Sequence, residues 1–381
     1  MSVSRTWRST ILLFPSLWSV AYLNGEISPG YIRMLLQRSG GHPLDVTIPR
    51  EYFRSGPKFN RYSHALDVSA HTSRIRKLHF WLYPNEGRND VKHVVKVLSK
   101  KPAPNLTHLK LVAFLPHPPT SFPNLFGLEF PKLRVLKVAG VEAWPEIVGA
   151  NLTRITINSS LDPRVLKQCV PYSPNLKVLK IQGVWDLKEL NLTTWRRIAL
   201  PPSICLVVQY STMCPRVLAL FSLARDGHLK VSPGRHPISD EPLLPTEISY
   251  LHNLHTLTRL HIKVHVHTRV TLELKCFRFD QPAFEVNLEY YTSEGRTIDQ
   301  QNVSRIMWFL YHLHRIVFSG VEELRMEGFI GSLELQGTQL LALLERMPAL
   351  TRLITTDSNE ETIRSALDSL GCQAVVIRVE R

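Results

Sequence analysis

A short phrase of apolar residues recurs along this chain and restricts its fold more than any other feature of the sequence. The phrase reads apolar, two residues, apolar, one residue, apolar, as in Leu106-Thr-His-Leu109-Lys-Leu111. Further copies begin at Ile75, Leu133, Leu152, Leu176, Leu257, Val321 and Leu350. The first five copies, from Ile75 to Leu176, begin 31, 27, 19 and 24 residues apart. Such a chain is expected to fold by stacking many small units against one another.

Alternation within the phrase predicts that each copy forms one β-strand. The second and third apolar residues share one face and are buried, whereas the residue between them points to the opposite face. The spacing of the copies brackets the period of about 20–29 residues that is typical of leucine-rich repeats. The predicted fold class is therefore α/β, an irregular leucine-rich-repeat-like solenoid over residues 24–381 with a short helical N-terminal cap.

Two stretches depart from this pattern. Residues 201–246 hold seven prolines and no copy of the phrase, so we expect an irregular connection there. Residues 257–291 instead alternate strictly between apolar and polar residues, which is typical of antiparallel strands in a hairpin or meander. We interpret this second stretch as a β insertion between repeats.

The charge of the chain is concentrated at its N-terminal end. The 381 residues hold 46 Lys and Arg against 32 Asp and Glu, a formal net charge of +14. Residues 1–140 alone hold 20 basic and 7 acidic residues, a net charge of +13. A basic surface favours an acidic partner, and the charge alone admits an acidic protein, nucleic acid or an anionic membrane. No apolar stretch approaches the length needed to span a membrane, so no membrane partner is predicted.

The alternation of the predicted strands indicates that many of these basic residues share one exposed face of the sheet. Residues that flank the second apolar position of each copy are expected to project from the exposed side of the strands. Basic residues at these positions include His108, His261 and Arg325. We call the following seven the basic stripe: Lys77, His79, Lys110, Lys137, Arg154, Lys180 and Arg259. The stripe is a hypothetical binding site for an acidic or phosphorylated protein segment. An ordinary solvated strand face is the alternative, and nucleic acid is a second candidate partner, although no aromatic stacking motif is visible.

The N-terminal segment carries a resemblance to a known family. Residues 2–18 resemble the last part of an F-box, and the matching positions are Val3, Trp7, Arg8, Pro15, Leu17 and Trp18. The segment 35–48 and the Pro-Asn-Leu phrases are similar to F-box proteins of mushroom-forming fungi. We therefore assign residues 1–23 as a partial F-box, of which the opening helices are absent.

This resemblance implies a substrate-recognition subunit of a Skp–cullin–F-box ubiquitin ligase. The six matching residues would then contact the Skp-type adaptor, and the remainder of the chain would hold the protein to be ubiquitylated. The missing opening leaves two alternatives, a truncated gene model or a protein that no longer binds the adaptor. A further alternative is that Trp7 and Trp18 only cap the first repeat.

Other sites are not indicated by the sequence. Five widely spaced cysteines without a Cys-x-x-Cys pair favour a reduced compartment, the cytoplasm or nucleus. Five Asn-x-Ser/Thr sequons leave a secreted glycoprotein as an alternative: Asn105, Asn151, Asn158, Asn191 and Asn302. No common enzyme motif occurs. His265 and His267 lack supporting ligands beside them, so we predict no metal site. We likewise predict neither catalysis nor a cofactor.

Overall fold

The computed structural model describes two compact units, residues Met1–Leu176 and Lys177–Arg381. Within them the described residues are 4–23, 27–49, 66–82, 96–98, 101–113, 130–140, 151–158, 166–167, 169–183, 195–211, 214–232, 244–245, 247–266, 269–291, 310, 316–328, 337–355 and 360–378. Each unit is described below by itself.

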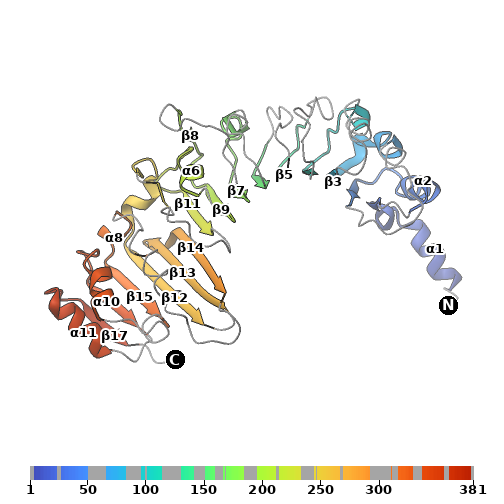
Figure 1. Cartoon of the computed structure of the whole chain (residues 1–381). Coiled ribbons are helices and arrows are strands. Elements are labelled where there is room, and N and C mark those ends of the chain that lie inside the picture. The colour runs from blue at the N-terminus through green and yellow to red at the C-terminus, as the bar shows by residue number, and fades with distance from the viewer. Residues whose placement is uncertain are drawn as a thin grey trace. The chain divides into compact units, whose positions relative to one another are not determined.

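The first unit is built on six parallel strands whose spatial order follows the chain (Figure 1). They are β1 (Val20–Tyr22), β2 (Leu44–Ile48), β3 (Ile75–Leu82), β4 (His108–Ala113), β5 (Val135–Ala139) and β6 (Arg154–Asn158). The phrase forms strands β3 to β6 because its apolar residues pack into one continuous layer. On β4, for example, Leu109 and Leu111 are buried, and they lie in register with the buried Leu136 and Val138 of β5.

Short helices precede and follow the first strand. They are α1 (Arg5–Leu13), the 3-10 helix η1 (Pro15–Trp18), α2 (Pro29–Arg38) and the 3-10 helix η2 (Thr72–Arg74). The hydroxyl of Ser28 caps α2, and Pro29 fits its first turn. This helix buries Ile32, Leu35 and Leu36 and packs against η1 and β1.

The second unit holds nine strands in the order β7-β9-β11-β14-β13-β12-β15-β16-β17. They are β7 (Val178–Gln182), β9 (Cys205–Gln209), β11 (His228–Ser232), β12 (Arg259–Val266), β13 (Arg269–Arg278), β14 (Gln281–Tyr291), β15 (Glu323–Glu327), β16 (Arg352–Thr355) and β17 (Val375–Arg378). A separate parallel pair is formed by β8 (Ile198–Ala199) and β10 (Phe221–Ser222).

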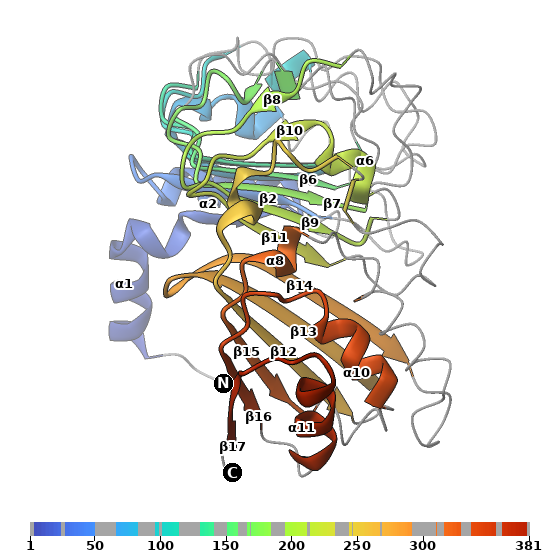
Figure 2. The same ribbon diagram turned by 90° about the vertical axis from the view of Figure 1, so that its left-hand side faces the viewer.

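The helices of the second unit are short and lie beside its strands (Figure 2). They are α6 (Cys214–Leu218), the 3-10 helix η4 (His252–Thr256), α8 (Ile316–Ser319), α10 (Gly337–Leu344) and α11 (Glu360–Ser369). Helix α10 packs against α11, which in turn packs against β17. After α11 the chain turns at Gly371, where φ is +63°, a conformation that glycine adopts without strain.

The predicted fold class is wrong. The structure holds fifteen strands in its two main sets and few helices among the described residues, so the strands form mixed and mostly parallel sheet rather than a leucine-rich-repeat-like solenoid. Strand order gives the physical reason. A solenoid stacks its repeats in chain order, whereas β11 pairs with β14 and β12 pairs with β15.

Residues 257–291 are the reason why the spatial order of the strands departs from their order in the chain. This stretch forms two antiparallel pairs, β12 with β13 and β13 with β14. The second and third strands therefore carry the chain back across the sheet before β15 resumes parallel pairing with β12. Strict alternation of the sequence indicates these antiparallel strands, but it does not reveal which strand meets β11.

Residues 201–246 also differ from the expected irregular connection. They contain β9, α6, β10 and β11, and two of these strands belong to the main set. The segment Cys205–Gln209 carries adjacent buried residues at Leu206, Val207 and Val208. Such continuous burial is typical of a parallel strand covered on both faces, and the phrase does not detect it.

Candidate partner-binding face

The basic residues of β3 to β6 lie on the sheet face opposite the buried layer. His79, Lys110 and Lys137 are in register on three neighbouring strands. Two residues earlier on β3 and β4, Lys77 is in register with His108. We call the set of six basic residues on this side the basic face: Lys77, His79, His108, Lys110, Lys137 and Arg154. Five of them were predicted as part of the basic stripe, and neighbouring strands bring them together in one unit.

The positive charges of the basic face act on one another. Burial lowers the pKa of His79, and the nearby Lys110, His108 and Lys77 lower it further. Burial likewise lowers the pKa of Lys110, with an added contribution from Lys137. Both effects mean that the charged forms are held at a cost in free energy. Binding of an anion to this face would lower that free-energy cost, because it neutralises the neighbouring positive charges.

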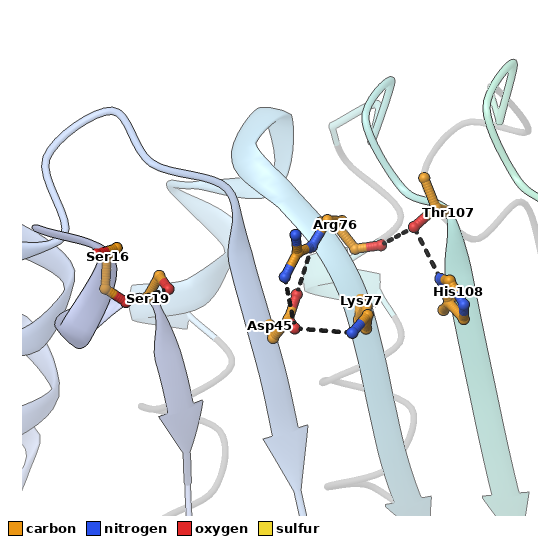
Figure 3. A network of polar contacts seen from close by, with 7 residues as sticks. All are labelled: Ser16, Ser19, Asp45, Arg76, Lys77, Thr107 and His108. Atoms are coloured by element: carbon orange, nitrogen blue, oxygen red, sulfur yellow. Dashed lines mark hydrogen bonds and ion pairs between the residues drawn. The ribbon is translucent and has the colours of Figure 1, made fainter.

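Asp45 is the acidic residue that touches this cluster. It lies on β2 beside Lys77, and its carboxylate accepts two hydrogen bonds of 2.9 Å from the Arg76 guanidinium. Lys77 Nζ lies 3.1 Å from the same carboxylate (Figure 3). Burial would raise the pKa of Asp45, but Arg76 and Lys77 outweigh it and lower this pKa. Asp45 therefore neutralises one end of the basic face.

The remaining cations of the face have no carboxylate partner in the part of the chain that the structure describes. Lys110 Nζ lies 4.4 Å from the ring centroid of Trp81, which is a cation–π contact. Lys137 and Arg154 form no ion pair with any described residue. The centre of the face thus offers ammonium and guanidinium groups to an external anion.

Two further residues of this site, Asp45 and Trp81, were not among the predicted ones, whereas His108 was expected to project from the exposed strand face. Asp45, His108 and Trp81 all lie at exposed-face positions of their strands. The alternation of Leu44-Asp-Val-Thr-Ile48 is the signal that places Asp45 on the same side as Lys77. For Trp81, the signal is its position two residues after His79 on one strand.

The two remaining residues of the basic stripe lie in the second unit. Lys180 lies on β7, in register with Val207 of β9. Arg259 on β12 donates a hydrogen bond of 2.9 Å to Asp280 and one of 2.6 Å to the carbonyl of Phe279. Arg259 is therefore already neutralised within the chain.

Ion pairs are the rule on the strands of the second unit. They include Lys230–Glu285 at 2.7 Å, Lys263–Glu327 at 3.2 Å, Lys275–Glu273 at 3.2 Å, Arg325–Glu327 at 2.8 Å and Arg352–Glu323 at 2.9 Å. The composition agrees with this picture, since residues 177–381 hold 23 basic and 22 acidic residues and residues 1–176 hold 23 and 10. The uncompensated charge therefore belongs to the first unit.

The predicted adaptor-binding residues lie in α1 and η1, apart from Val3, which lies outside the described residues. Trp7 and Leu17 are 65% and 61% exposed. Trp18 instead donates a hydrogen bond of 3.0 Å to the carbonyl of Ile11, and the Arg38 guanidinium lies 4.7 Å above its ring. Pro15 opens η1, and Arg8 lies within α1. The segment thus presents one tryptophan to solvent and uses the other for packing.

The histidines of β12 do not assemble a metal site. His261 and Lys263 both face Glu327, with His261 Nε2 at 3.3 Å and Lys263 Nζ at 3.2 Å from its carboxylate, and His267 lies outside the described residues. Among the described residues, no group of three or more potential ligands converges on one point. Nor does any described helix have the length and apolar character to cross a membrane.

Comparisons of the chain with protein-family models, with curated proteins and with solved structures found no match.

Proposed function

We propose that the chain is a protein-interaction module without enzymatic activity, whose first unit binds an acidic or phosphorylated segment of a partner protein. The observation that carries this proposal is the basic face, where Lys110 and Lys137 lie side by side without a carboxylate partner among the described residues. Carboxylate or phosphate oxygens would accept charge-assisted hydrogen bonds from these ammonium groups.

An extended peptide fits this face better than a compact ligand. Strands are spaced about 4.8 Å apart, so cations repeated on neighbouring strands lie at spacings that acidic side chains of an extended segment can match. Trp81 adds an apolar surface beside Lys110. Recognition of acidic motifs by clustered basic residues follows the same principle.

We further propose that the N-terminal segment contacts a Skp-type adaptor and that the chain thereby presents its partner to a cullin ubiquitin ligase, in the cytoplasm or nucleus. The resemblance of residues 2–18 to an F-box supports this proposal, and so does the exposure of Trp7, Leu13 and Leu17. Exposed apolar groups gathered on one short segment are typical of protein-binding surfaces.

Charge reversal tests the binding proposal. A labelled peptide of twelve glutamates and aspartates, its phosphoserine counterpart and a single-stranded oligonucleotide of similar charge would be titrated against the full chain. The double variant Lys110→Glu, Lys137→Glu is expected to weaken peptide binding at least about tenfold, because each charge-assisted hydrogen bond contributes ~1.5–3 kcal/mol. Lys101→Glu is the matched control, since Lys101 is exposed in the connection before β4.

Two results would overturn the proposal. One is equal peptide binding by the double variant and the control at physiological salt. The other is tighter binding of the oligonucleotide with a steep loss between low and moderate salt, which indicates a phosphate-backbone interaction. For the adaptor proposal, affinity capture of the full chain from its own cells should recover Skp and cullin subunits, and their absence would contradict it.

A further inference from the structure

Three side chains of the second unit bring a thiol, an imidazole and a carboxylate into contact. Cys205, His228 and Glu285 lie on β9, β11 and β14, which are neighbours in the sheet. Cys205 Sγ lies 3.8 Å from Nδ1 of His228. On the other side of the ring, Nε2 of His228 lies 3.4 Å from the Glu285 carboxylate. The imidazole is therefore placed between a thiol and an anion.

The surroundings favour a charged imidazole. The side chains of His228 and Glu285 are 23% and 13% exposed, so water screens their interaction only in part. Burial opposes the charge on His228, but its contacts with Cys205 and Glu285 outweigh burial and raise the pKa of His228 to about 9. His228, together with Lys230, lowers the pKa of Glu285 to about 2 despite its burial. An imidazolium at this position stabilises a neighbouring thiolate.

The other cysteines lack this arrangement. Cys169, Cys214 and Cys276 are buried, and burial raises the pKa of each thiol, to about 12 for Cys169 and Cys214. Cys372 is half-buried like Cys205, but its thiol donates to the carbonyl of Leu350 at 3.6 Å. Of the five cysteines, Cys205 alone combines partial exposure with a contact to an imidazole of a described residue.

We propose that Cys205 is a modification site for soft carbon electrophiles, such as α,β-unsaturated carbonyl compounds. In this reaction the thiolate attacks the β-carbon, a C–S bond forms, and the C=C π bond opens to an enolate. The proton that left the thiol resides on His228 and passes to the α-carbon, so the product is a neutral thioether adduct and no oxidant is needed. Glu285 acts as a positioning residue, because it orients the imidazole and stabilises its charged form.

The site is distinct from a metal centre and from the basic face. Thiol and carboxylate lie on opposite nitrogens of His228, so they do not converge on a common point. The other charged groups nearby are Lys230, which lies 2.7 Å from Glu285, and Lys275, which is in register with Glu285 on β13. Because all of these residues lie in the second unit, the inference does not depend on the proposed peptide binding.

Labelling with N-ethylmaleimide tests the proposal on the folded full chain. The rate of adduct formation at each cysteine would be followed by peptide mass spectrometry at pH 6 and pH 8. An ordinary thiol is less than about 1% thiolate at pH 6, so we expect Cys205 to react at least about tenfold faster than Cys372 at this pH. Buried Cys276 reports on folding, since it should be labelled only when the unit unfolds.

Variants assign the effect to the histidine and the carboxylate. His228→Asn is expected to slow Cys205 labelling at pH 6 at least about tenfold, because it removes the imidazole that contacts the thiol. Glu285→Gln should cause a smaller change of the same kind. His261→Asn is the matched control, because His261 is also half-buried beside a carboxylate but contacts no thiol. Equal rates for Cys205 and Cys372, or equal effects of His228→Asn and His261→Asn, would overturn the proposal.

Discussion

Lys110 and Lys137 lie directly opposite each other on adjacent parallel strands, β4 and β5, and no described carboxylate lies between them. Like charges placed opposite each other across a strand pair destabilise a sheet. The folded protein therefore retains an electrostatic cost at this position, and that cost is the physical basis for expecting an anionic partner there.

Replacing one of these lysines should have opposite effects on the stability of the folded chain and on its affinity for an acidic peptide. We expect Lys137→Met to raise the free energy of unfolding by ~0.2–1 kcal/mol, because it removes the repulsion, and to weaken acidic-peptide binding. Urea denaturation at low and high salt measures the first effect, which should shrink as salt screens the charges. Lys101→Met is the control, and a loss of stability on Lys137→Met greater than in the control would contradict this view.

The carboxylate of Asp45 should make the first unit sensitive to acid. Because its folded-state pKa is lowered, Asp45 contributes stability at neutral pH that is lost as the pH falls through that pKa, below about 3.9. Asp45→Asn is expected to cost up to about 1 kcal/mol at pH 7, since the pair with Arg76 is partly exposed. The difference between the two proteins in urea should narrow toward pH 3, and a constant difference would be inconsistent with this ion pair.

The histidines of the basic face predict a pH-dependent affinity. Burial and nearby cations lower the pKa of both His79 and His108, so these rings are mainly neutral at pH 7. A bound anion stabilises their charged forms. Binding of a sulfated peptide, whose own charge is constant in this range, should therefore strengthen a few-fold from pH 7 to pH 5. His79→Asn with His108→Asn should flatten the profile in fluorescence anisotropy titrations, and an unchanged slope would exclude these rings.

Strand positions in the first unit follow from sequence because burial alternates on each strand. Leu109 and Leu111 are buried and Lys110 between them is not, which is the pattern that the phrase predicts. The same pattern does not reveal which strands pair with each other. Asp45 and Arg76 are far apart in the sequence, and only the pairing of β2 with β3 brings them into contact.

The second unit was less predictable because its strand order depends on long-range pairing. No local pattern indicates that β11 pairs with β14 or that β12 pairs with β15. The contact between Cys205 and His228 depends on the pairing of β9 with β11, and Glu285 joins them only because β14 is the next strand. Residues of these strands carry no motif at fixed spacing, so their proximity was not visible from the chain.

The sequon residue Asn105 has a structural role that a glycan would disrupt. Its Nδ2 donates a hydrogen bond of 2.7 Å to the carbonyl of Ser73, and its Oδ1 accepts one of 2.7 Å from Lys132. We expect Asn105→Ala to cost ~0.5–1.5 kcal/mol. Asn175→Ala is the matched control, since Asn175 holds the same position in its phrase but has no hydrogen-bond partner among the described residues. Equal urea midpoints for the two variants would contradict the assignment.

The two tryptophans of the N-terminal segment distinguish adaptor contact from simple packing. Trp18 packs beneath Arg38 and donates to Ile11, so Trp18→Ala should cost ~1–2 kcal/mol, the sum of a cation–π contact and a hydrogen bond. Trp7 is 65% exposed, so Trp7→Ala should change stability by less than ~0.5 kcal/mol while reducing recovery of the Skp-type adaptor. Thermal unfolding and affinity capture measure the two effects. If Trp7→Ala instead destabilises the chain as much as Trp18→Ala, both residues serve packing, and the segment is a structural cap without a role in adaptor binding.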